Sequence, residues 1–198
     1  MSTLPATILH RAQSLPEGGA LSPKEFLHLG SRDAVDQAFS RLAKTNQLMR
    51  VARGIYVCPI SGRFGVRAPA PEKVIQALAD QRGETVATHG ASAANALGLT
   101  QQVPIREVSL SSGRTRKLLF GHAQVMVKHT PQWMLALGAC PAGAAVRALA
   151  WMGPMHIESS LISLHRSLAP SEWELLAQAR AIFPGWMAKA IGREAARG

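Results

Sequence analysis

The segment 22–59 constrains the fold most strongly, because it carries the signals for two consecutive helices followed by a tight β-hairpin. Ser22-Pro23-Lys24-Glu25 has the form of a capping box, in which the serine and glutamate side chains satisfy free backbone N–H groups at a helix start. Gly30 is suited to a left-handed cap at the end of this helix, and Ser31 can cap a second helix at once. The segment therefore predicts two helices joined by a very short turn.

The second predicted helix has one apolar stripe and a broad polar side. Val35, Ala38, Phe39 and Leu42 recur at helical spacing, which predicts a single buried face. The polar side carries hydrogen-bonding groups that suit base edges and phosphates. Arg32, Gln37 and Arg41 are expected to share one face of the helix. The full set of polar residues on this side is Arg32, Asp33, Asp36, Gln37, Ser40, Arg41 and Lys44.

Two short β-prone runs, 48–51 and 55–57, follow this helix and flank Arg53 and Gly54. Gly54 can adopt the positive φ of a tight hairpin turn, and Arg50 and Arg53 make the hairpin basic. Two helices followed by a basic hairpin are the order of a winged helix-turn-helix, whose second helix enters the major groove of DNA. The alternative is a helical pair and a hairpin whose charges are only solvated.

A DNA-binding interpretation assigns a role to each polar side chain. Arg32 and Gln37 are predicted to contact bases, because arginine matches guanine N7 and O6 and glutamine matches adenine N6 and N7. The predicted phosphate contacts are Ser31, Arg41 and Lys44. Arg50 and Arg53 are the predicted DNA-binding residues of the wing.

The run from Gly30 through Tyr56 resembles the N-terminal winged helix of the AbiEi family, the antitoxins of type IV toxin–antitoxin systems. The matching stretches are LGSRDAVDQAFSRLAK and LMRVARGIYVCP, and a second match is GASAANALGLTQQVP at 90–104. The resemblance implies a repressor that binds inverted repeats in its own operator. It also implies a C-terminal domain that opposes a nucleotidyltransferase toxin without holding it in a tight complex.

The charge balance favours a polyanionic partner. The chain of 198 residues has a net charge of +10, which indicates nucleic acid first and an anionic membrane surface second. Cys58 and Cys140 form no Cys-x-x-Cys pair, which is typical of a protein of the reducing cytoplasm. The apolar stretch 133–153 is interrupted by Pro141, glycines and Arg147, which favours short buried segments over a spanning helix. We therefore expect a cytoplasmic protein without a membrane segment.

The order of the remaining signals predicts an α+β protein in two domains. Residues 1–59, with a first helix at 3–15, form the winged helix-turn-helix domain, and the proline- and glycine-rich segment 60–70 is the linker. Residues 71–198 form a C-terminal α+β domain with a small antiparallel sheet and a helical tail. Its strands are expected at 107–110, 117–120 and 124–129 as a meander, and its tail helices at 142–152, 158–168, 171–182 and 186–196.

No catalytic motif is complete. His156-Ile157-Glu158 matches half of a zinc deaminase motif, but no cysteine follows Cys140 to complete the metal site. We therefore expect no enzyme, no cofactor and no metal. Two alternatives stay open: a winged-helix regulator whose C-terminal domain senses a ligand, which an apolar pocket there would favour, and a nucleic-acid-processing enzyme, which a cluster of carboxylates or histidines would favour.

A basic run in the second half follows the turn at Gly113. Arg114, Arg116 and Lys117 are expected to lie together at one end of the sheet. Cations at a strand edge commonly discourage edge-to-edge pairing, and this is one interpretation. The other is a contact with nucleic acid, either the operator or an RNA that the toxin attacks.

Overall fold

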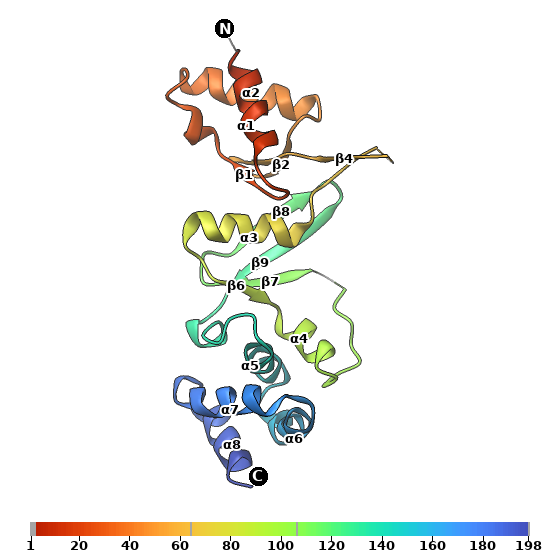
Figure 1. The fold of residues 1–198 in the computed structure, drawn as a ribbon, viewed down its shortest axis with the longest axis vertical. Coiled ribbons are helices and arrows are strands. Elements are labelled where there is room, and N and C mark those ends of the chain that lie inside the picture. Colours follow the sequence, from red (N-terminus) through yellow and green to blue (C-terminus); the bar gives the residue numbers. More distant parts are fainter. Residues whose placement is uncertain (1–2, 64, 106, 198) are drawn as a thin grey trace. The chain divides into compact units, whose positions relative to one another are not determined.

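The computed structural model describes residues 3–63, 65–105 and 107–197, which form helices and small antiparallel sheets (Figure 1). The contacts divide the chain into two compact units. The N-terminal unit contains the chain up to Glu84 together with Arg116–Val127, and the C-terminal unit contains Thr85–Thr115 and the chain from Lys128 onward. The expected α+β class and the C-terminal helical tail are both present.

The N-terminal unit begins with three helical segments and one short strand. It contains α1 (Leu4–Ser14), β1 (Ala20–Leu21), the 3-10 helix η1 (Pro23–Phe26) and α2 (Arg32–Lys44). The predicted capping box is confirmed, because the Ser22 N–H donates to Glu25 Oε1 at 2.7 Å and the Ser22 hydroxyl accepts from Lys24 N–H. The prediction of a left-handed cap at Gly30 is wrong, because η1 already ends at Phe26 and Gly30 does not have a positive φ.

Helix α2 buries its apolar stripe as predicted. Val35, Ala38, Phe39 and Leu42 are all buried, and Ser31 Oγ accepts the Ala34 N–H at 3.2 Å as the N-cap. The Phe39 ring meets Phe26 of η1 edge-on, with ring centroids 5.5 Å apart. The same ring lies 4.7 Å from that of Tyr56, so one aromatic cluster joins the two helices to the sheet.

The sheet of this unit is antiparallel, with strand order β1-β3-β2. Strands β2 (Met49–Ala52) and β3 (Ile55–Val57) form the predicted hairpin, in which Ala52 pairs with Ile55 and Arg50 with Tyr56. Gly54 has a φ of +69°, as its place in the turn requires. On the other edge, Leu21 of β1 pairs with Tyr56, so β1 and the hairpin form one sheet.

The segment predicted as a linker is folded back on itself as the hairpin β4 (Ile60–Gly62) and β5 (Gly65–Arg67). Helix α3 (Pro71–Arg82) follows and belongs to the N-terminal unit. The hairpin of β8 (Arg116–Phe120) and β9 (Ala123–His129) supplies the rest of this unit up to Val127. The contacts thus divide the chain differently from the boundaries 1–59, 60–70 and 71–198, and independent folding of residues 1–59 stays a prediction.

Helix α3 is attached to the loop after α1 by Glu17. Its carboxylate pairs with Lys73, lies 3.6 Å from Arg67 Nη1 and accepts the Ala70 N–H at 3.3 Å. Gly18 has a φ of +89°, and a side chain at this position would collide with the backbone of Lys73. The start of α3 therefore lies directly against this loop.

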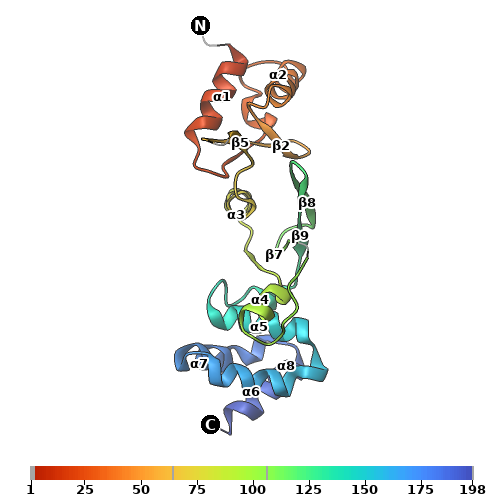
Figure 2. The ribbon, with the colours of Figure 1, turned by 90° about the vertical axis from the view of Figure 1, so that its right-hand side faces the viewer.

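The C-terminal unit is mainly helical. Strands β6 (Val86–Thr88) and β7 (Val108–Ser111) pair antiparallel, and α4 (Gly90–Ala96) follows β6. Then come η2 (Gln132–Met134), α5 (Pro141–Met152), η3 (Pro154–His156), α6 (Ile157–Ser167), α7 (Pro170–Gln178), η4 (Ala179–Ile182) and α8 (Gly185–Ala195). Helices α5 to α8 pack around one apolar core (Figure 2), whose fully buried members include Leu149, Leu161, Leu164, Leu176, Met187 and Ile191.

Two details of this region test the sequence-based predictions. The predicted meander is wrong, because the sheet has the strand order β6-β7-β9-β8, in which β8 does not neighbour β7. The β8–β9 hairpin within the predicted meander is confirmed. The apolar stretch 133–153 forms the two short helices η2 and α5, as expected. In the described part of the chain, no helix reaches the length and hydropathy needed to cross a membrane.

The attachment of α3 gives a pH-dependent prediction. The hydrogen bond and ion pair with Lys73 hold the pKa of Glu17 below its ordinary value of 4.5. A depressed carboxyl pKa stabilises the fold above the ordinary pKa, and this stabilisation is lost as the pH falls through the lowered value. Glu17→Gln should therefore lower the melting temperature of the full-length protein at pH 7, and the difference from the wild type should shrink below pH 4.5.

The matched control is Glu72→Gln. Glu72 is exposed in the first turn of α3, and the described residues give it no ion pair. This variant should change the melting temperature little at either pH. A Glu17→Gln variant that loses as much stability at pH 3 as at pH 7 would contradict the assigned role of Glu17.

Candidate nucleic-acid interface

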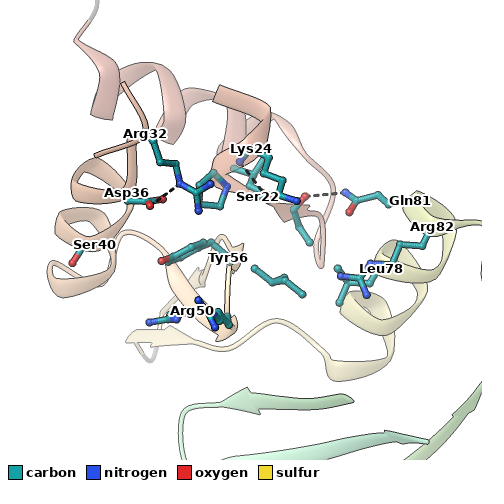
Figure 3. Close-up of a pocket in the computed structure, with 16 residues that line it drawn as sticks. Ser22, Lys24, Arg32, Asp36, Ser40, Arg50, Tyr56, Leu78, Gln81 and Arg82 are labelled. Atoms are coloured by element: carbon teal, nitrogen blue, oxygen red, sulfur yellow. Dashed lines mark hydrogen bonds and ion pairs between the residues drawn. The ribbon is translucent and has the colours of Figure 1, made fainter. Parts of the chain in front are cut away.

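An open cleft of about 780 Å³ lies on the N-terminal unit. Figure 3 shows α2 on one side of it and α3 on the other, with Tyr56 and Arg50 of the sheet between them. Asp36 is the acidic residue among its described lining residues. Its basic lining residues come from four elements and are Lys24, Arg32, Arg50, Arg53 and Arg82. A cleft lined mainly by charge of one sign focuses the electrostatic potential, so the excess of basic residues makes this cleft attract anions.

The first basic residue of α2 is held by a neighbour one turn away. Arg32 Nε donates to Asp36 Oδ2 at 2.7 Å, and the two side chains are 59% and 46% exposed. An exposed pair of this kind contributes little to stability. The bond uses only Nε, so the terminal nitrogens of Arg32 keep their donors for a phosphate or a base edge.

The hairpin contributes the part of the cleft that lies between α2 and α3. Arg50 pairs with Tyr56 across β2 and β3, and Arg53 lies in the two-residue turn between these strands. The pairing register shifts between Arg50 and Ala52, beside this turn. Arg50 and Arg53 both line the cleft.

The structure divides the predicted DNA-contacting residues into two groups, although all of them are exposed. Arg32, Arg50 and Arg53 line the cleft. Residues Gln37, Arg41 and Lys44 of α2 do not line it. Arg32 and Arg41 are about two and a half turns apart, so they point to opposite sides of the helix, and the expectation that Arg32, Gln37 and Arg41 share one face is wrong.

Ser31 lies beside the cleft wall at the start of α2. Its hydroxyl oxygen already accepts the Ala34 N–H as the N-cap. The hydroxyl proton stays available for a phosphate oxygen. The cap and the phosphate contact predicted for Ser31 are therefore compatible.

Two basic residues of the cleft were absent from the predicted site. Lys24 belongs to the predicted capping box, and Arg82 lies in the last turn of α3, which the sequence-based boundaries assign to the other domain. Arg82 also lies 4.0 Å from Glu84. Only the packing of α3 reveals its position, and no local sequence signal marks it.

The predicted patch of Arg114, Arg116 and Lys117 does not form one exposed surface. The Arg116 side chain is 12% exposed and donates to Glu84 Oε2 at 2.6 Å. Consecutive strand residues point to opposite faces of a sheet, and Lys117 is exposed on the other one. Arg114 is exposed and belongs to the C-terminal unit. Arg116 therefore acts as the partner of a carboxylate, which the basic run in the sequence does not reveal.

The position and burial of the metal-ligating and nucleophilic side chains bear on catalysis. Within residues 3–63, 65–105 and 107–197, no three His, Cys, Asp or Glu side chains lie close enough to hold a metal ion. Burial raises the pKa of the Cys58 thiol, which keeps it in the poorly nucleophilic protonated form at neutral pH.

The comparisons with known proteins give a family and no function. Neither a curated protein nor a solved structure matches the chain. The sequence pattern of one family, described as a family of unknown function (DUF6088), matches residues 7–168. This match includes the whole basic cleft and most of the C-terminal unit. The chain therefore belongs to the DUF6088 family of unknown function.

Proposed function

We propose that the N-terminal unit is a winged helix-turn-helix that binds double-stranded DNA, and that the protein is a sequence-specific transcriptional repressor. The observation that carries this proposal is the cleft lined by α2 and the β2–β3 hairpin, where arginines from both elements converge. The net charge of +10 adds a general attraction to a polyanion.

The order of elements supports the proposal. A winged helix-turn-helix has three helices, a three-stranded sheet with the third strand in the centre, and a hairpin that follows the recognition helix. The first six elements of the N-terminal unit have the order α1-β1-η1-α2-β2-β3, with β3 between β1 and β2 in the sheet. Helix α2 is then the recognition helix and the β2–β3 hairpin is the wing.

The polar residues of α2 form two groups, one that lines the cleft and one that does not. This division fits a helix that lies in a groove of DNA. A groove is bordered by a phosphate backbone on each side, so a recognition helix needs cations on two sides rather than on one face. Arg32 lies on the side of the cleft, and Arg41 and Lys44 lie elsewhere on the exposed surface of the helix. The helix N-terminus at Ser31 carries a partial positive charge that favours a phosphate.

The resemblance to AbiEi antitoxins refines the proposal. It makes the target DNA the protein's own operator with inverted repeats, and it makes the protein the cytoplasmic antitoxin of a nucleotidyltransferase toxin that it does not bind tightly. The reading frame beside its gene tests this part separately. A neighbouring nucleotidyltransferase supports the antitoxin role, and its absence leaves repression as the proposed function.

Gel shifts with the full-length protein test the DNA-binding proposal. A duplex from the region upstream of its own gene should bind much more tightly than a random duplex, and each phosphate contact should add about −0.9 to the log–log salt slope. Arg32→Ala should relax specificity at one base pair at a cost of about 1–3 kcal/mol, whereas Arg53→Ala should weaken all sequences alike and reduce the slope by about 1. Equal affinity for both duplexes would contradict sequence-specific repression.

The Arg32–Asp36 pair gives a sharper prediction. Asp36 is an anion inside a basic cleft, so it repels phosphates and restrains Arg32. Asp36→Ala should therefore tighten binding to random DNA and reduce the preference for the upstream duplex.

The matched control is Asp33→Ala, which makes the same change in charge. Asp33 is exposed on the same helix but does not line the cleft. Asp33→Ala should increase the affinity for random DNA clearly less than Asp36→Ala does. If both variants tightened random binding equally, net charge alone would explain the effect and the cleft would have no special role.

A further inference from the structure

A second cavity, of about 360 Å³, lies within the C-terminal unit. Its size is at the lower end of the range for small-molecule sites, which is about 300–1,000 Å³. Three of its lining residues are tryptophans from different elements: Trp133 of η2, Trp151 of α5 and Trp186 of α8. Indole rings offer flat apolar surfaces on which a planar ligand can stack.

Arg147 of α5 lines the same cavity and is almost completely buried, with 1% of its surface exposed. Its Nη1 donates to the carbonyl oxygens of Gly138, at 2.8 Å, and Met134, at 3.4 Å. Its Nε is buried without a hydrogen-bond partner, and in the described part of the chain no ion pair includes this arginine. A buried charge without a counter-charge is costly, so this guanidinium is prepared for an anion that the fold does not supply.

Two further polar groups of the cavity, Lys128 and His89, also suit an anionic ligand. Lys128 is exposed at its edge, and none of the described lining residues is Asp or Glu. His89 Nδ1 accepts the Ala91 N–H at 3.3 Å, so the neutral ring carries its proton on Nε2 and can donate it. Burial and the nearby charge of Lys128 lower the pKa of His89, which keeps this ring a neutral donor at neutral pH.

We propose that this cavity binds a small organic anion, with a carboxylate or phosphate group at Arg147 and Lys128 and a flat apolar body against the tryptophans. This site lies entirely in the C-terminal unit and does not depend on DNA binding. A site of this kind fits the alternative function that the sequence leaves open, a winged-helix regulator whose C-terminal domain senses a ligand. The two carbonyl bonds of Arg147 hold the guanidinium in place before a ligand arrives, which reduces the cost of ordering it on binding.

The indole N–H signals of the full-length protein report on this site directly. Benzoate and phenyl phosphate serve as the two anionic probes, and benzamide is the neutral control of the same shape. At least one of the two anions should shift the indole N–H signals of Trp133, Trp151 and Trp186 in a saturable way. Trp173 is an internal reference, because its ring stacks on His165 at 4.3 Å and does not line the cavity. A response to only one anion would identify the headgroup.

Three variants separate a binding role from a structural one. Lys128→Gln should weaken the anionic probe about fivefold, whereas Lys189→Gln, an exposed lysine of the same unit outside the cavity, should leave it unchanged. Arg147→Met should abolish saturable binding, and if this variant fails to fold, the Lys128 comparison decides. The proposal is overturned if neither anion binds better than benzamide, if Trp173 shifts as much as the other indoles, or if the two lysine variants behave alike.

Discussion

The burial of the Phe39 ring is the interaction on which the N-terminal unit depends. This ring is completely buried and touches Phe26 of η1 and Tyr56 of β3, so it fixes α2 against both the preceding helix and the sheet. Truncating a buried aromatic side chain typically costs about 3–5 kcal/mol, a large part of the stability of a small domain. Tyr56 also pairs with Arg50 and lines the cleft, so the same contact brings the arginines of helix and hairpin together.

Local sequence signals predicted the elements of this unit well. The capping box at Ser22, the N-cap at Ser31 and the apolar stripe of α2 each depend on residues within one or two turns, so the sequence determines them directly. The Gly54 turn is equally local. The same signals identified Arg32, Arg50 and Arg53, three of the arginines that meet in the cleft.

Features that depend on tertiary contacts could not be predicted in this way. Arg82 joins the cleft because α3 packs on the N-terminal unit through Glu17, which lies far away in the sequence. Arg116 lies in a basic run but is paired with Glu84, and β7 pairs with β6 rather than with the next strand. Arg147 interrupts an apolar stretch, and the sequence alone does not show that it lines a cavity with three tryptophans. Strand partners and buried charges depend on which segments meet, and periodicity carries no information on that.

Hydrogen–deuterium exchange of the full-length protein, with and without a saturating duplex from its own upstream region, tests the central claim most directly. DNA binding through the cleft predicts slower exchange in 31–44, which contains α2 and its cap, and in the hairpin 49–57. Exchange in the tail helices α6 to α8 should stay unchanged. Protection confined to the C-terminal unit, or no protection at saturation, would contradict the assignment of the cleft as the DNA-binding surface.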